Sequence, residues 1–333
     1  MNKKIVTILL ISAAFLLNAC QKNIDVFVPD AGQTNGPDTV WSNTVAATAP
    51  VFSLQTTLAT TSLLSEPVKD SFEINLNAVT VILTNGLQLT FPAGSVVTST
   101  GEVVKGKIYV EARLIKTKGD MVLLNKPTTS NGSMLVSGGE VFVSLTRNGQ
   151  QLQLAPNARF YIRYTDAPIS QQMKFFYGVE ASTAASPVNW IPSTNSMDTI
   201  SAGSQFYEIA STHLRWINCD YFYDTTNITR SQVSAVLPSN YTNANTTAFL
   251  AFKELRSVLG MYGDVPEKRF LSPKVPNGKT AIVVVISKQG NDYFLGKETI
   301  TIGVNATTNN IQKVPITPVK SSLAAIRTYL ATL

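Results

Sequence analysis

Apolar and polar residues alternate with a period of two over much of the chain from residue 67 onward, a pattern that predicts β-strands. The clearest case surrounds Asn85-Gly86, because both residue types tolerate the positive φ angles of a two-residue type I′ turn. Such a turn would pair Ile82 with Leu89. We therefore predict a hairpin that places Ile82, Leu87 and Leu89 on one face.

A second hairpin is predicted around Asn148-Gly149, where the same turn would set Leu145 opposite Leu152 and Val143 opposite Leu154. Its other face is polar, as in an antiparallel sheet with one solvated side. Further strands are predicted at 107–114 and 158–164, and 203–213 could form another. A less regular stretch after Asp166 contains the segments 173–178 and 188–191, and the aromatic segment 216–223 follows residue 213.

Beyond residue 225, short strands recur at 233–237, 248–255, 281–287 and 293–304, the last of them broken at Gly296. The continuous apolar run from Ala281 to Ile286 predicts a strand that is buried on both faces. The segment 321–333 is the only convincing helix, with Leu323, Ile326 and Leu330 on one face and Ser321 or Ser322 as its cap.

The predicted fold class is therefore all-β. An antiparallel β domain occupies residues 67–215, and a smaller immunoglobulin-like or fibronectin-like β-sandwich occupies residues 216–320. A short C-terminal helix covers residues 321–333. The domain joint is predicted near the aromatic segment that starts at Trp216.

The first twenty residues follow a different pattern. A basic start at Lys3 and Lys4 precedes an apolar run from Ile5 to Leu17, the layout of a secretory signal peptide, and the run is too short to span a bilayer. The segment Leu17-Asn18-Ala19-Cys20 resembles the lipobox of bacterial lipoproteins. The resemblance implies that residues 1–19 are removed and that Cys20 is acylated. An ordinary signal peptide with an incidental cysteine is the alternative.

Residues 20–66 are predicted to form the lipidated cysteine and a flexible tether, because turn formers gather between Pro29 and Asp38. An ordered N-terminal strand region is the alternative. Gln21 after Cys20 is compatible with sorting to the outer membrane, so the expected location is the cell envelope, as an outer-membrane lipoprotein. Whether the body faces the periplasm or the outside stays undecided.

Composition narrows the classes of partner. Removing residues 1–19 takes away Lys3 and Lys4, which leaves 25 basic and 21 acidic residues, a net charge of about +4. No Lys/Arg-rich run is present, so nucleic acid is not an expected partner. If Cys20 is lipidated, Cys219 has no disulfide partner and is predicted to be a small buried residue.

The stretch Gly86-Leu87-Gln88-Leu89-Thr90-Phe91-Pro92-Ala93-Gly94-Ser95 resembles the opening of ZU5-type β domains, followed by similar segments at 106–110 and 137–141. With the lipoprotein signal, the chain looks like secreted lipoproteins of Bacteroidetes-type bacteria, which carry sequence segments similar to residues 173–178, 188–190 and 216–220. The resemblance implies a β-rich interaction module. Some ZU5 domains cleave themselves at His-Phe-Ser, but here the single His213 is followed by Leu214.

Catalytic patterns are not found in the sequence. His213 is the only histidine, no nucleophile-elbow motif accompanies it, and the supply of Cys and His is too small for a zinc cluster. A glycosidase would need two convergent carboxylates. The candidate acids fall in no recognisable motif: Glu111, Asp120, Glu140, Asp166, Glu180 and Asp220. We predict a non-enzymatic protein without catalytic, metal-binding or cofactor-binding residues.

The aromatic residues Trp216, Tyr221 and Tyr223 admit two interpretations. Their rings could stack on the sugar rings of a glycan, or they could fill the interface between the two domains, which is the commoner use of large amphipathic side chains. We favour the interface and leave the glycan as the alternative.

Three Asp-Thr sequences resemble the O-glycosylation sequon of Bacteroidetes: Asp38-Thr39-Val40, Asp198-Thr199-Ile200 and Asp224-Thr225-Thr226. All three fall in predicted linkers or loops, where a transferase could reach them. Thr39, Thr199 and Thr225 are therefore candidate acceptors.

These observations predict a membrane-anchored, non-enzymatic lipoprotein whose β domains serve binding or cell-envelope structure. Its partners would be the membrane, through the N-terminal lipid, and a glycan or an envelope protein. A glycan-binding accessory lipoprotein of a polysaccharide uptake system is the alternative. An envelope glycan hydrolase ranks third.

Overall fold

The first group of strands forms an eight-stranded antiparallel sheet. The computed structural model describes residues 40–41, 67–75, 77–179 and 188–333. The main path of the sheet runs β1 (Val68–Ile74), β5 (Gly106–Ile115), β7 (Ser133–Arg147), β15 (Arg215–Phe222), β11 (Lys174–Val179) and β12 (Asn189–Pro192), with β6 (Thr129–Ser130) and β8 (Gln150–Gln151) paired to β7.

A five-stranded sheet packs against it to make a β-sandwich. In spatial order its strands are β13 (Thr199–Ala202), β14 (Phe206–Ser211), β10 (Phe160–Thr165), β3 (Gln88–Phe91) and β2 (Val79–Ile82), and β4 (Val96–Val97) pairs with β9 (Gln153–Leu154) nearby. Apolar residues of both sheets share one core. At its centre the ring of Phe91 stacks on Phe72 and Phe160, at centroid distances of 5.4 and 5.2 Å.

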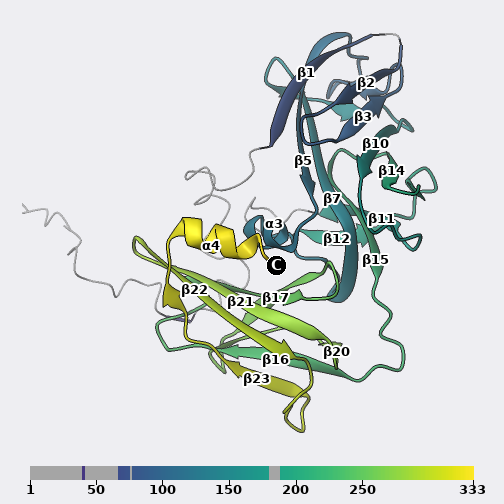
Figure 1. Ribbon diagram of the computed structural model, residues 1–333. Helices are drawn as coiled ribbons and strands as arrows, with labels where there is room; N and C mark the ends of the chain where they lie inside the picture. The colour runs from purple at the N-terminus through teal and green to yellow at the C-terminus, as the bar shows by residue number, and fades with distance from the viewer. Residues whose placement is uncertain (1–39, 42–66, 76, 180–187) are drawn as a thin grey trace, which may run out of the picture. The chain divides into compact units, whose positions relative to one another are not determined.

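The second group of strands forms a nine-stranded sheet that folds over on itself (Figure 1). Its path is β20 (Val275–Pro276), β16 (Arg230–Val236), β19 (Arg269–Leu271), β18 (Val258–Asp264), β17 (Thr246–Phe252), β21 (Thr280–Gln289), β22 (Asp292–Thr301) and β24 (Val319–Lys320), and β23 (Ile311–Pro315) pairs in parallel with β16. Side chains of β16, β17, β18 and β21 enclose a second core. The predicted all-β class is confirmed.

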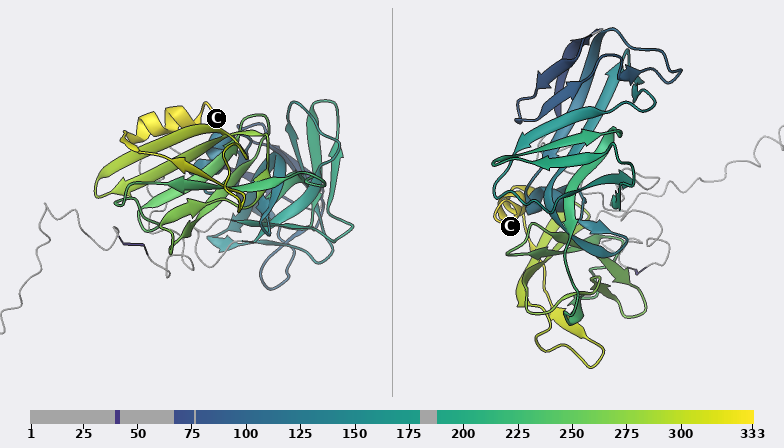
Figure 2. Two further views of the ribbon diagram at one scale, coloured as in Figure 1. Left: turned by 90° about the horizontal axis from the view of Figure 1, so that it is seen from below. Right: turned by 90° about the vertical axis from the view of Figure 1, so that its right-hand side faces the viewer.

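Two short helices complete the described chain. The predicted C-terminal helix is α4 (Leu323–Leu330), and the Oγ of Ser322 caps it by accepting a hydrogen bond from the Ala325 amide at 3.1 Å. The helix α3 (Lys118–Leu123) was not predicted, because a single capped turn leaves little periodicity. The yellow helix α4 can be followed in both views of Figure 2, and α3 is labelled in Figure 1. Within the described ranges, no helix is both long enough and apolar enough to cross a membrane.

A third apolar cluster is shared by the two groups of strands. It combines Trp216 of β15 and Trp190 of β12 with Phe249 of β17, Val284 of β21 and Ile326 of α4. In β21, alternate residues enter this cluster and the core of the nine-stranded sheet. The prediction that 281–286 is buried on both faces is therefore confirmed.

The domain division differs from the prediction. β15 pairs with β7 on one side and β11 on the other, so 215–222 belongs to the first sandwich. The chain enters the second group of strands only after Phe222, rather than at residue 216. All described residues fall in one compact unit, because the shared cluster leaves no gap between the two groups.

The two predicted hairpins have different outcomes. At Asn148-Gly149 both residues have positive φ and Thr146 pairs with Gln151, as a type I′ turn requires, although β9 then leaves to pair with β4. At Asn85-Gly86 only Gly86 has positive φ, and Ile82 pairs with Gln88. The predicted register is therefore wrong by one residue, and Ile82 is 71% exposed.

Part of the predicted tether belongs to the body. Trp41 packs against the second core, and its ring centroid lies 5.1 Å from that of Phe270. The predicted signal peptide, Cys20, Thr39 and the rest of the tether lie outside the described residues.

Candidate functional site

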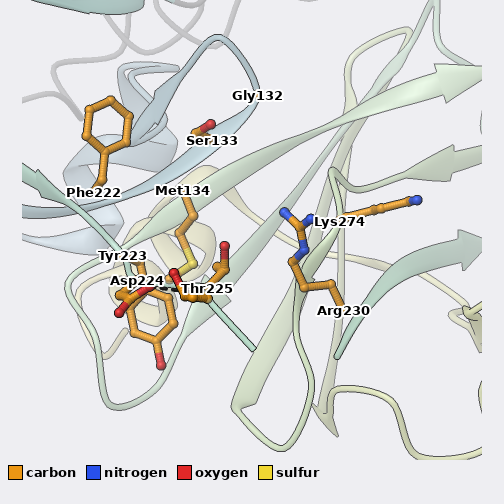
Figure 3. Close-up of a pocket in the computed structure, with 10 residues that line it drawn as sticks. Gly132, Ser133, Met134, Phe222, Tyr223, Asp224, Thr225, Arg230 and Lys274 are labelled. Atoms are coloured by element: carbon orange, nitrogen blue, oxygen red, sulfur yellow. Dashed lines mark hydrogen bonds between the residues drawn. The ribbon is translucent and has the colours of Figure 1, made fainter. Parts of the chain in front are cut away.

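A pocket of about 470 Å³ lies where the chain leaves β15 (Figure 3). Its walls include Tyr223, Asp224 and Thr225 from the connection after β15, and Arg230 and Lys274 from β16 and the residue before β20. The Tyr223 amide donates to the Met134 carbonyl at 3.0 Å, which fixes the connection against the start of β7. Residues distant in the sequence therefore form one concave surface.

The pocket carries two cations, Arg230 and Lys274, and one acid, Asp224. Arg230 and Lys274 are both exposed, and neither forms an ion pair with another described residue. Asp224 is the acid of the pocket, and hydrogen bonds from Thr226 lower its pKa. The half-buried ring of Tyr223 adds an apolar face, so the pocket can receive a ligand that carries both a ring and an acidic group.

The three predicted aromatics separate into two environments. Trp216 is 5% exposed and lies in the shared cluster, with ring centroids 5.0 Å from Phe142 and 6.3 Å from Trp190. Its faces are therefore closed to a glycan. Tyr221 and Tyr223 are half-buried, and burial raises the pKa of Tyr221. Only Tyr223 lines the pocket.

Two of the candidate acids converge. Glu140 of β7 pairs directly with Asn218 of β15, and Asp220 lies two residues further along β15, on the same face. Burial raises the pKa of Glu140 well above its usual range, and the neighbouring charge of Asp220 raises it further. Burial also raises the pKa of Asp220 to about 7. Both residues are 0% exposed, so a substrate cannot reach them in this conformation.

The other candidate acids do not join a catalytic pair. Asp166 forms a salt bridge with Arg256, which ties the first sandwich to the β17–β18 connection. Glu111 pairs across β5 and β7 with Ser144, and Asp120 bonds to the cap residue of α3. Glu180 lies outside the described residues.

His213 has an acidic partner that the sequence did not indicate. Its Nδ1 lies 3.3 Å from Oδ2 of Asp198, whose carboxylate also accepts hydrogen bonds from the Ser193 hydroxyl and the Thr212 amide. Tyr177 stacks on the imidazole at 4.8 Å. In the described part of the chain no hydroxyl or thiol bonds to Nε2, so the pair lacks a nucleophile.

The remaining predicted sites are spread over the fold. Cys219 is buried, as predicted, and burial raises the pKa of its thiol far above the usual range. Thr199 is exposed on the edge strand β13, and Thr225 is half-buried in the pocket wall. Among the described residues, no group of three or more His, Cys, Asp or Glu side chains is placed to hold a metal ion.

Comparison with known proteins adds no assignment. The sequence matches no model of a known protein family, and no curated protein is significantly similar to it. The ZU5-like and lipoprotein resemblances therefore stay predictions, and the function is argued from the site itself.

Proposed function

We propose that this chain is a lipoprotein, anchored through Cys20, whose β body binds an acidic partner of the cell envelope and performs no catalysis of its own. The observation that carries the proposal is the pocket beside Tyr223, where two exposed cations form no ion pair and outnumber the single acid, Asp224. The convergent acids Glu140 and Asp220, by contrast, are sealed inside the fold.

A binding role agrees with the chemistry of the pocket. Arg230 offers a planar fork of donors suited to carboxylate or phosphate, and Lys274 adds a second positive charge. Because neither cation is held in an ion pair, both can attract an incoming anion, and Asp224 offsets only one of the two positive charges. Anchoring at the outer membrane, on either face, would present this pocket to other components of the envelope.

A glycan is the second candidate ligand, and the aromatic lining of the pocket favours it. Phe222 is 41% exposed and Tyr223 is half-buried, and both line the pocket. A glycan with uronic acid units would use the rings and the cations together. Such a protein would serve as the glycan-binding accessory of a polysaccharide uptake system. A purely structural envelope module would leave the pocket unused.

The anchor is tested by Cys20→Ser. We expect the wild-type chain to partition into detergent with the membrane fraction and the variant to move to the aqueous fraction. Equal partitioning of the two would contradict lipidation at Cys20.

The pocket is tested by affinity electrophoresis of the full chain in gels that contain acidic or neutral polysaccharides. We expect acidic polysaccharide to retard the wild type. Tyr223→Ala and Lys274→Gln should abolish the retardation, whereas Lys313→Gln, which removes an exposed lysine on β23, should leave it intact. Retardation that survives both pocket variants would exclude this pocket as the binding site.

A further inference from the structure

Three buried carboxylate oxygens on the face between β7 and β15 accept no hydrogen bond. They are Oε1 and Oε2 of Glu140 and Oδ1 of Asp220. Both side chains are 0% exposed, so water does not solvate them from outside. Buried carboxylates without partners are strongly unfavourable, so such groups hold a proton, are paired or bind an ion.

The side chains that carry these oxygens lie next to one another on one face of the sheet. Asn218 lies directly opposite Glu140, and its amide nitrogen donates to Oδ2 of Asp220 at 2.7 Å. Since Gly138 bulges out of β7, the regular strand β15 keeps Asn218 and Asp220 on the same face. The amide oxygen of Asn218 has only a long contact, 3.5 Å, with the Ser137 hydroxyl. Two carboxyl groups and one amide group therefore lie together on this face of β7 and β15.

Neighbouring cations do not supply the missing bonds. The ammonium of Lys126 lies over the ring of Trp216, 4.8 Å from its centroid, and it offsets part of the negative charge of Glu140. It donates no hydrogen bond to either Oε atom. Arg256 is engaged by Asp166 and by the Gly138 carbonyl.

We propose that Glu140, Asp220 and Asn218 bind a hard cation, Ca²⁺, inside the fold. Carboxylate and amide oxygens are the ligands Ca²⁺ prefers, and it accepts irregular geometry. Mg²⁺ fits less well, because it holds its water shell and needs near-octahedral geometry. Only two of the ligands are acids and the third is an amide, which is consistent with the absence of a group of three acids in the described chain.

The ion would have a structural role that is independent of ligand binding in the pocket. Glu140 and Asp220 come from two strands, so a shared cation would join β7 to β15 at the bulge. A bound ion of this kind stabilises the folded state, because the unfolded chain does not hold the ligands together.

The test uses the full chain after treatment with a chelator and desalting. Thermal unfolding is followed in EDTA, CaCl₂ and MgCl₂ at equal ionic strength, and bound metal is measured by elemental analysis. We expect CaCl₂ to raise Tm by several degrees, MgCl₂ to raise it less, and about one calcium ion to remain per chain. No bound calcium together with an unchanged Tm would overturn the proposal.

Substitutions assign the ligands. Glu140→Gln and Asp220→Asn remove one charge each with little change of shape, so each should fold, unfold in EDTA at a Tm equal to or above that of the wild type, and lose the response to Ca²⁺. Glu298→Gln, an exposed acid of β22, is the matched control and should keep the response. A Ca²⁺ response that persists in Glu140→Gln or Asp220→Asn would place the ion elsewhere and overturn the assignment.

Discussion

Asp166 and Arg256 form a salt bridge in which Nη1 of the arginine lies 2.8 Å from Oδ2 of the aspartate and Nη2 lies 3.1 Å from Oδ1. Asp166 follows β10 and Arg256 precedes β18, so the bridge joins strands of different sheets. Nη1 also donates to the Gly138 carbonyl at 3.2 Å, and the Arg256 carbonyl accepts from the Ser137 amide. Arg256 thus binds both the Asp166 carboxylate and the backbone of β7 at its bulge.

Arg256→Met should destabilise the fold by about 3 kcal/mol, the lower end of the cost of removing one partner of a buried pair. The lower end applies because the arginine side chain is 23% exposed while that of Asp166 is 4% exposed. The loss arises mainly because the carboxylate of Asp166 stays buried without a partner. Chemical denaturation measures the change in the free energy of unfolding.

The double variant Arg256→Met/Asp166→Asn separates that cause from lost packing. We expect it to be more stable than Arg256→Met alone, because the second substitution removes the unpaired charge. Additive destabilisation by the two substitutions would show that the charge pair is not the reason.

Gly119 of α3 allows the end of α4 to approach closely. A Cβ atom at Gly119 would overlap the carbonyl oxygen of Leu330, a backbone atom that cannot move aside cheaply. Gly119→Ala should therefore destabilise the fold by about 1–3 kcal/mol and expose the amides of α4 to hydrogen exchange. Gly260→Ala is the control, since the nearest atom to its Cβ would be 3.9 Å away. Unchanged exchange in α4 would contradict this packing.

Trp41 should stabilise the second core, inside the nine-stranded sheet, although it lies within the predicted tether. Trp41→Ala removes a half-buried ring from Phe270, and we expect a loss of about 2 kcal/mol, below the cost of truncating a fully buried aromatic residue. Trp41→Phe should recover more than half of the loss. If Trp41→Ala has the same midpoint denaturant concentration for unfolding as the wild type, the contact between Trp41 and Phe270 does not contribute to stability.

The local sequence predicted where strands and turns lie better than it predicted which strands pair and in which register. The run 281–286 is buried on both faces as its composition required, and Ser322 caps the C-terminal helix. The register at Asn85-Gly86 could not be read, because Asn-Gly suits both the two-residue turn and the three-residue turn with a bulge that the chain adopts. The parallel pairing of β16 with β23 is non-local and leaves no local signal.

The candidate sites could likewise be predicted only where neighbouring residues in the sequence form them. Tyr223 and Thr225 stood out in the sequence, but the cations Arg230 and Lys274 did not, because only the fold brings them to the same pocket. In the sequence, Glu140 and Asp220 are two of six candidate acids that fall in no recognisable motif. Their convergence depends on the pairing of β7 with β15, which no spacing along the chain reveals.

The buried acid Asp220 predicts how stability changes with pH in the absence of added cations. Its pKa is about 7 in the folded protein and 3.8 in an unperturbed carboxyl group, so between these values the folded state retains a proton that the unfolded state has lost. The contribution of the protonated acid to stability is complete below about pH 3.8 and is lost as pH rises toward 7. Each pKa unit corresponds to about 1.4 kcal/mol, so a difference of about 3.2 units gives a loss of at most about 4.5 kcal/mol.

Asp220→Asn removes this titration and should therefore gain stability relative to the wild type as pH rises. We expect the difference in free energy of unfolding between Asp220→Asn and the wild type, measured in EDTA, to grow steadily across this range and to level off above about pH 7. Asp70→Asn, which changes an exposed acid of β1, should show no such trend. A difference that is constant with pH would mean that Asp220 ionises equally in both states, and the burial of its carboxylate would then need another explanation.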